Sequence, residues 1–139
     1  MADVEKYESH QVVIRKPESR IYTVLSDFKN FSPALEGKVD DWKVEGDSCS
    51  FKVKGMKIAL RIAERVDNKH VKIVADEGGI PIDFTFWVQL HEVDAHDTRV
   101  RMVLHAELNM MMRMMIGGKI QAGLDQAVEG LATALNNFR

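Results

Sequence analysis

Residues 111–137 read MMRMMIGGKIQAGLDQAVEGLATALNN, and no other segment of the chain has a helical pattern as long. A helix of this length reaches about 40 Å at a rise of 1.5 Å per residue. The remaining sequence must therefore supply an apolar surface that covers one side of this helix. Its bulky apolar residues recur at helical spacing and form one stripe: Ile120, Leu124, Val128, Leu131, Leu135 and Phe138.

A second stripe on the same helix consists of small residues, about a quarter-turn from the first. Glycine inside a helix costs roughly 0.8–1 kcal/mol relative to alanine, so its presence needs a reason. One interpretation is close approach of backbone from the sheet or the short helices, and the other is room for a ligand. The pair Gly117-Gly118 is a candidate hinge near the start of the helix. The small stripe comprises Gly123, Ala127, Gly130 and Ala134.

Five of the eight methionines lie at positions 110–112, 114 and 115, where the helical pattern begins. Methionine is flexible and polarisable, so a cluster suits an apolar surface that fits partners of varying shape. The run is either the mouth of an apolar cavity or filler at a frayed helix start. We expect Met112, Met115 and Ile116 to share the inward arc with Ile120, and Met111 or Met114 to remain at the surface.

Upstream, six segments between residues 39 and 108 alternate apolar and polar residues and are separated by short turns. Strict alternation predicts an antiparallel meander with one solvated and one apolar face. Another strand is expected over residues 7–15. Six cations fall on the solvated face, which is either an ordinary outer surface or a site for an anionic partner: Lys52, Lys54, Arg61, Lys72, Arg99 and Arg101.

Two short helices are predicted between the first strand and the meander. Pro17 suits a first helical turn, and an apolar stripe ending at Phe28 follows it. A second helix starts at Ser32-Pro33, where serine can cap it. The chain is therefore predicted to be α+β: a curved seven-stranded antiparallel sheet wrapped around the long C-terminal helix. We expect residues 1–139 to form one domain.

Composition excludes several classes of function. The net charge of −2, with 45% apolar and 29% charged residues, argues against binding of nucleic acid or of a membrane surface as the main role. No apolar run reaches about 18 residues, so no stable membrane insertion is expected. The polar N-terminus carries no secretory signal, and Cys49 is the lone cysteine, which together predict a cytoplasmic protein.

Motifs for chemistry are sparse. The histidines form no H-x-x-H or H-E-x-x-H pair, so we expect no metal and no cofactor. Glu64 and Glu92 extend apolar rows but lie at strand ends, where we expect them to be solvated. Tyr22 or Ser26 could supply a single polar anchor. We assign no catalytic residue.

Residues 7–35, YESHQVVIRKPESRIYTVLSDFKNFSPAL, together with the closing amphipathic helix, give a recognisable order of elements. This order resembles the START / Bet v 1-like (SRPBCC) superfamily, in its polyketide cyclase/dehydrase type, over nearly the whole chain. The resemblance implies a helix-grip fold, with an apolar cavity between the sheet and the long helix. It also implies binding of a hydrophobic small molecule, although one fold hosts many functions.

The leading hypothesis is a protein that binds or carries a hydrophobic small molecule or lipid, as a monomer or homodimer. A cyclase- or dehydratase-like enzyme is the less favoured alternative, and a protein-interaction module is the third. The candidate ligand-binding residues are those expected to face the cavity: Phe28, Phe31, Trp42, Phe51, Leu60, Ile73, Phe84, Phe86, Met102, Leu104, Met112, Met115, Ile116, Ile120, Gly123, Leu124 and Ala127.

Overall fold

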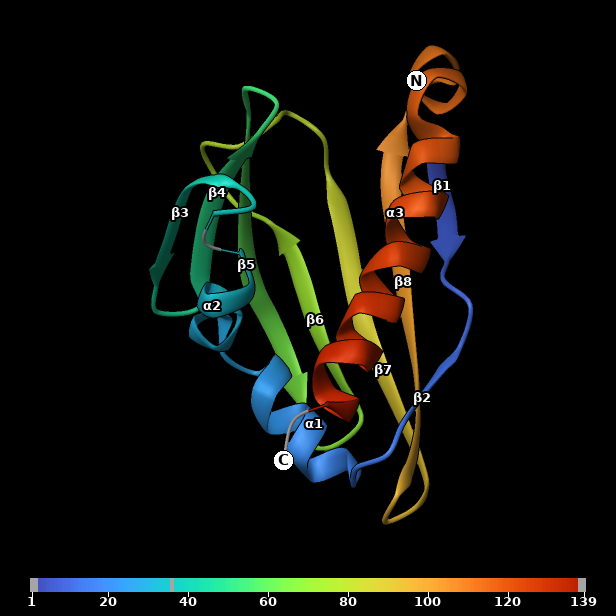
Figure 1. The fold of residues 1–139 in the computed structure, drawn as a ribbon. Helices are drawn as coiled ribbons and strands as arrows, with labels where there is room; N and C mark the ends of the chain where they lie inside the picture. The colour runs from blue at the N-terminus through green and yellow to red at the C-terminus, as the bar shows by residue number, and fades with distance from the viewer. Residues whose placement is uncertain (1–2, 36, 138–139) are drawn as a thin grey trace.

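The computed structural model describes residues 3–35 and 37–137 and has the predicted helix-grip architecture (Figure 1). Its long helix and its antiparallel strands confirm the α+β class. The elements in chain order are β1 (Asp3–Glu8), β2 (Val12–Ile14), α1 (Glu18–Leu25), the short 3-10 helix η1 (Phe28–Phe31), α2 (Ser32–Leu35), β3 (Asp40–Glu45), β4 (Ser48–Val53), β5 (Met56–Val66), β6 (His70–Ala75), β7 (Phe84–Asp94), β8 (Asp97–Leu108) and α3 (Met110–Asn136).

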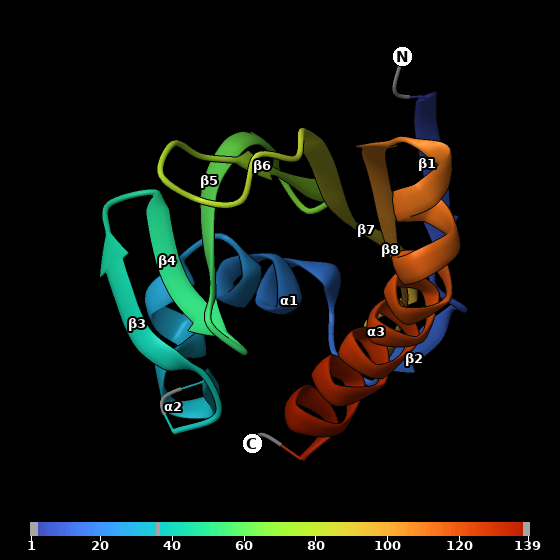
Figure 2. The same cartoon turned by 90° about the horizontal axis from the view of Figure 1, so that it is seen from above.

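The strands form one antiparallel sheet in the order β1-β8-β7-β6-β5-β4-β3, and β2 pairs with β8. The sheet curves around α1 and α3, which lie on its concave side (Figure 2). We call the concave side the inner face. The six alternating segments of the sequence are β3 to β8, so the predicted meander is confirmed.

The single first strand expected over residues 7–15 is wrong, because the chain forms two strands there. Glu8 lies opposite Val103, and Val12 lies opposite Val100. The segment from Glu8 to Val12 therefore advances by four residues, whereas the facing segment of β8 advances by three. This extra residue is a β-bulge. Ser9 accommodates it: its backbone N–H donates to the Met102 carbonyl at 2.8 Å, and its hydroxyl accepts from the Met102 N–H at 2.9 Å. The sheet consequently has eight strands rather than seven.

Helix α3 begins at Met110, where the Asn109 side chain caps it by accepting from the Met112 N–H at 2.8 Å. It continues unbroken through Gly117 and Gly118 to Asn136, so the candidate hinge shows no break. Phe138, expected on the bulky stripe, lies outside the described residues. The buried residues of α3 are Gly117, Leu124, Val128, Ala132 and Leu135.

The two main helices cover different parts of the sheet. Helix α3 packs chiefly on β8, β2 and β1, whereas α1 packs on β7 and β6. Ile21 of α1 and Val128 of α3 are both fully buried and belong to one apolar core. Neither helix packs extensively on β3, β4 or β5. Apolar side chains at that end of the inner face are therefore less well covered.

One flank of α3 closes the free edge of the sheet at β1 and β2. Gln121 donates to the Glu8 carbonyl at 2.7 Å, and Asp125 accepts from the His10 N–H at 2.9 Å. Asn136 donates to the Val13 carbonyl at 3.1 Å and accepts from the Arg15 N–H at 2.7 Å. An uncovered edge invites pairing with another chain. These polar side chains of the helix therefore replace a missing neighbouring strand.

Candidate functional site

Ten of the predicted ligand-binding residues are half-buried, six on the inner face of the sheet and four on η1 and α3. Trp42 of β3 and Phe51 of β4 contact each other in a tilted arrangement, with ring centroids 5.9 Å apart. The Trp42 indole N–H donates to Ser32 Oγ at 2.8 Å, which holds β3 against α2. Together the half-buried residues form an apolar surface that the helices leave incompletely covered: Phe31, Trp42, Phe51, Leu60, Phe84, Phe86, Leu104, Met112, Ile116 and Ile120.

Four other predicted residues are part of the core instead. Phe28, Ile73, Met102 and Leu124 are each at most 8% exposed and pack within the same apolar cluster. Their side chains are already surrounded by the helices and the sheet. They form the packing between the helices and the inner face, and the structure leaves little of their surface for a ligand.

The small stripe of α3 faces open space. A methyl group added to Gly123 or Gly130 would meet no other described part of the molecule within 4 Å, and Ala127 and Ala134 are exposed. The flank carrying Asp125 is fixed to β1 and β2, and the small stripe lies on the other flank. The interpretation that backbone approaches these glycines closely is therefore wrong, and the space beside them remains open.

The methionine run lies mainly at the surface. Met110, Met111, Met114 and Met115 are 67–78% exposed, whereas Met112 is half-buried. The expected inward position of Met115 is wrong. It lies five residues before Ile120, which places the two about 140° apart around the helix. Met112 and Ile116 remain on the same arc as Ile120 and are half-buried with it.

Sequence reasoning missed three polar residues at one end of the inner face. Glu5 and Tyr7 of β1 lie opposite Ala106 and Leu104 of β8, whose side chains point inward. Arg113 of α3 reaches the same place, and its Nη1 donates to Glu5 Oε1 at 3.2 Å. The bulge at Ser9 reverses which residues of β1 face inward. The alternation of the sequence alone gave no sign of this reversal.

The polar candidates named from the sequence have structural roles. Tyr22 Oη donates to Asp67 at 3.1 Å in the β5–β6 turn, and Ser26 Oγ donates to the Tyr22 carbonyl at 2.6 Å. Glu92 accepts from the Glu18 N–H at 3.0 Å. Glu64 lies 3.7 Å from His70 and is exposed, as expected.

Cys49 is buried on the inner side of β4. Burial raises the pKa of its thiol to about 12. A thiol is nucleophilic only as thiolate, which this environment disfavours. Cys49 therefore behaves as a small apolar residue.

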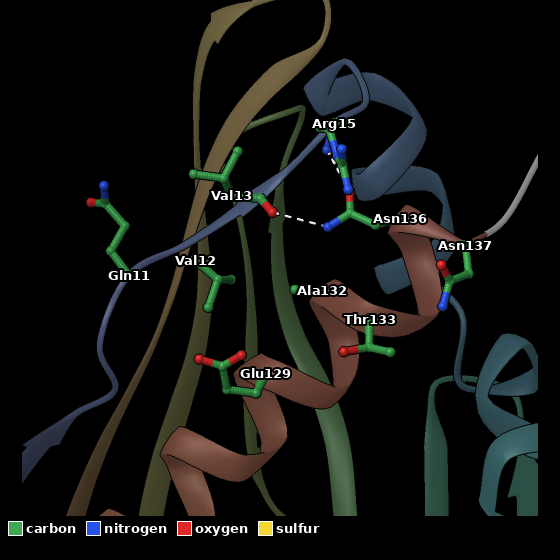
Figure 3. A pocket seen from close by; sticks show the side chains of 9 residues that line it. All are labelled: Gln11, Val12, Val13, Arg15, Glu129, Ala132, Thr133, Asn136 and Asn137. Atoms are coloured by element: carbon green, nitrogen blue, oxygen red, sulfur yellow. Dashed lines mark hydrogen bonds between the residues drawn. The ribbon is translucent and has the colours of Figure 1, made fainter.

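Two depressions lie elsewhere on the molecule. The first, about 460 Å³, lies between β2 and the C-terminal half of α3, where Asn136 already pairs with Val13 (Figure 3). Its wall is largely polar and includes Arg15, Glu129 and Thr133. The second, about 490 Å³, is lined largely by outer-face residues of β5 to β8 and of β1. Neither depression lies between the small stripe and the sheet.

Of the six cations predicted on the outer face, all but Lys54 have a partner among the described residues. Arg99 binds Asp97 at 2.7 Å, and this contact lowers the pKa of the Asp97 carboxyl. The ammonium of Lys72 lies 5.9 Å from the centre of the Trp87 ring. The remaining ion pairs are Lys52–Asp41, Arg61–Asp76 and Arg101–Glu8, at 3.5–3.9 Å. This pairing argues against a site for a strongly anionic partner on the outer face.

His10 links the β1–β2 bulge to α3. Its Nδ1 lies 3.1 Å from Asp125, and its Nε2 contacts Glu129, one turn further along the helix. The hydrogen bond to Glu129 is the main cause that raises the pKa of His10 above its ordinary value of 6.5. The His10 N–H is the main cause that lowers the pKa of Asp125.

This contact should make stability depend on pH. Folding raises the pKa of His10, so the contacts of its protonated ring stabilise the fold fully below about pH 6.5. This stabilisation is lost as the pH rises through the pKa that His10 has in the folded protein. We expect wild type to resist urea better than His10→Gln at about pH 5.5, and the difference to shrink at about pH 8.5. Urea midpoints of both proteins at both pH values measure it. If the difference in urea midpoint between wild type and His10→Gln grows with pH, protonated His10 does not stabilise the fold through Asp125 and Glu129.

Within the described ranges, 3–35 and 37–137, no three His, Cys, Asp or Glu side chains are grouped so as to hold a metal ion. None of the described helices combines the length and the apolar character needed to cross a membrane.

Comparison with known proteins gives structural similarity without sequence similarity. No family model matches the sequence, and no curated protein matches it. Norcoclaurine synthase from Thalictrum flavum superposes with a TM-score of 0.80 at 12% identity, over 99% of this chain and 89% of that chain. The Zhui aromatase/cyclase from Streptomyces sp. R1128 gives 0.75 at 11% identity, over 96% and 94% of the two chains. The Aha1 dimer from Colwellia psychrerythraea gives 0.68 at 18% identity, over 96% and 97%.

At these identities the likeness shows the fold. The chain shares a helix-grip fold with these structures, which is the fold that the resemblance to the START / Bet v 1-like (SRPBCC) superfamily implied. The proteins that share this fold have different functions, so the fold by itself assigns no activity.

Proposed function

We propose that this protein binds a hydrophobic small molecule or lipid between the inner face of the sheet and α3. One observation carries the proposal: the inner face is apolar but incompletely covered. Six predicted site residues on that face and four on η1 and α3 are half-buried, and open space lies beside Gly123 and Gly130. Binding becomes more favourable by roughly 25 cal/mol for each Å² of exposed apolar surface that a ligand removes from water.

Binding is favoured over catalysis because the interior has few groups for acid–base chemistry. Among the described residues, the buried polar side chains are Ser9 and Thr98, and both are bonded to backbone. A general acid or base must lie within hydrogen-bond reach of the reacting group. Neither of these two side chains is one of the usual acids or bases. Glu5 and Tyr7 are of that type, but they lie at one end of the inner face and Glu5 is paired with Arg113, so we favour a carrier or binding protein.

The structural neighbours support a small aromatic ligand. One crystal structure of norcoclaurine synthase holds dopamine and hydroxybenzaldehyde, and Zhui is an aromatase/cyclase. Ligands with aromatic rings would suit an inner face lined by Phe51, Phe84 and Phe86. A cytoplasmic setting, and a monomer or homodimer, remain predictions from the sequence.

Three measurements test the proposal. Native mass spectrometry of the freshly purified protein should show a co-purified molecule, or the protein should enhance the fluorescence of N-phenylnaphthylamine. Fatty acids, quinones or aromatic polyketides should then displace this probe and raise the melting temperature, because a ligand that binds only the folded state stabilises it. No co-purified molecule, no fluorescence enhancement and no thermal stabilisation together would overturn the proposal.

A further inference from the structure

A small polar cluster closes one end of the otherwise apolar inner face. It consists of Glu5 and Tyr7 from β1 and Arg113 from α3. Glu5 and Tyr7 lie directly opposite Ala106 and Leu104. Opposed residues on antiparallel strands share a face of the sheet, so Glu5 and Tyr7 continue the inner rows of β8 to the edge strand.

Tyr7 and Arg113 both lie next to Gly117. A methyl group at Gly117 would lie 3.1 Å from Tyr7 Oη and 3.7 Å from Arg113 Cγ. The missing side chain of Gly117 therefore makes room for the tyrosine hydroxyl, whereas the stem of the arginine would be in ordinary contact with it. On its other side, Arg113 donates to Glu5 at 3.2 Å, and the Glu5 side chain is 24% exposed.

The cluster has hydrogen-bonding capacity that the protein does not use. Tyr7 is half-buried, and its hydroxyl has no partner in the part of the chain that the structure describes. A guanidinium has five N–H donors, and Arg113 directs Nη1 to Glu5. The Arg113 side chain is 48% exposed, so its other donors face water. The half-buried Tyr7 hydroxyl is the group that gains from a partner, which a bound molecule could supply here.

We propose that Tyr7, assisted by Arg113, anchors the ligand through one uncharged oxygen group, a hydroxyl or a carbonyl. The inference rests on the proposed function, since it places the rest of the ligand on the apolar inner face. The carboxylate of Glu5 neutralises the Arg113 charge, so the pair favours an uncharged group over a carboxylate. The half-buried residues beside the cluster, Ile116 and Ile120, would contact the apolar body.

Three probes of similar size separate the contributions of a hydroxyl, an apolar group and a carboxylate to binding: naphthol, methylnaphthalene and naphthoate. Wild type should bind naphthol more tightly than methylnaphthalene. The Tyr7→Phe change should lower the affinity for naphthol about three- to tenfold and leave the affinity for methylnaphthalene unchanged. Tyr22→Phe is the matched control, because the Tyr22 hydroxyl bonds Asp67 elsewhere. Glu5→Gln leaves Arg113 without its counter-charge and should raise the affinity for naphthoate severalfold.

The outcomes are distinct. If wild type binds none of the probes, the proposed function and the anchor fail together. If the probes bind but Tyr7→Phe weakens naphthol and methylnaphthalene equally, or no more than Tyr22→Phe does, the anchor is wrong and the apolar site stands. If Glu5→Gln leaves naphthoate binding unchanged, the preference for an uncharged group is wrong. Melting curves of the variants confirm that each one is folded.

Discussion

Gly130→Leu is expected to lower the affinity for N-phenylnaphthylamine by about tenfold or more without destabilising the protein. The added side chain enters the open space that lies beside Gly130, where the proposed ligand would lie. Leucine also favours a helix interior over glycine, so the free energy of unfolding should rise by up to about 0.8 kcal/mol. Probe titrations and urea unfolding of the same samples measure the two effects.

Gly118→Leu is the matched control. Gly118 also has open space beside it and lies in the same helix. It is five residues from Gly123, which places it about 140° around the helix from the small stripe. This variant should gain similar stability and keep full affinity for the probe. If Gly130→Leu keeps full affinity too, the small stripe faces solvent and takes no part in binding.

The sheet was predictable because each strand of the meander has one apolar and one polar face. A shift of one residue would expose the whole apolar row of a strand such as β7, so the alternation fixes the register. The first strand escaped prediction for the same physical reason. The bulge at Ser9 inserts one residue, and the inward positions change from Val12 and Ile14 to Tyr7 and Glu5. Nothing in the local alternation marks such an insertion.

The candidate site was predictable only in outline. Periodicity shows which residues of a strand point inward, but not which of them a helix covers. Met102 is buried because α3 packs on β8, whereas Phe51 of β4 stays half-buried. That difference depends on where α3 crosses the sheet, which long-range contacts decide. The flank of α3 that faces β2 is fixed by Asp125 and Asn136, and their role becomes visible only when the strands they meet are known.

Ile14→Ala should cost about 2–5 kcal/mol of unfolding free energy. Ile14 is 0% exposed, and β2, on which it lies, carries α3 on one side of the apolar core. Removing three carbon atoms there leaves a cavity that the paired strand and the helix cannot both collapse to fill. Domains are typically stable by only about 5–15 kcal/mol, so this change removes a large share.

Val13→Ala is the control on the neighbouring position, where the side chain points outward and is 42% exposed. Its cost should stay within about 0.5 kcal/mol, as for most surface substitutions. Equilibrium urea unfolding of both variants, followed by tryptophan fluorescence and far-UV circular dichroism, gives the two free energies. Equal costs would mean that β2 opens locally before the domain unfolds. In that case α3 would be held by β8 and β1 alone, and the contact of His10 with Asp125 and Glu129 would contribute little to global stability.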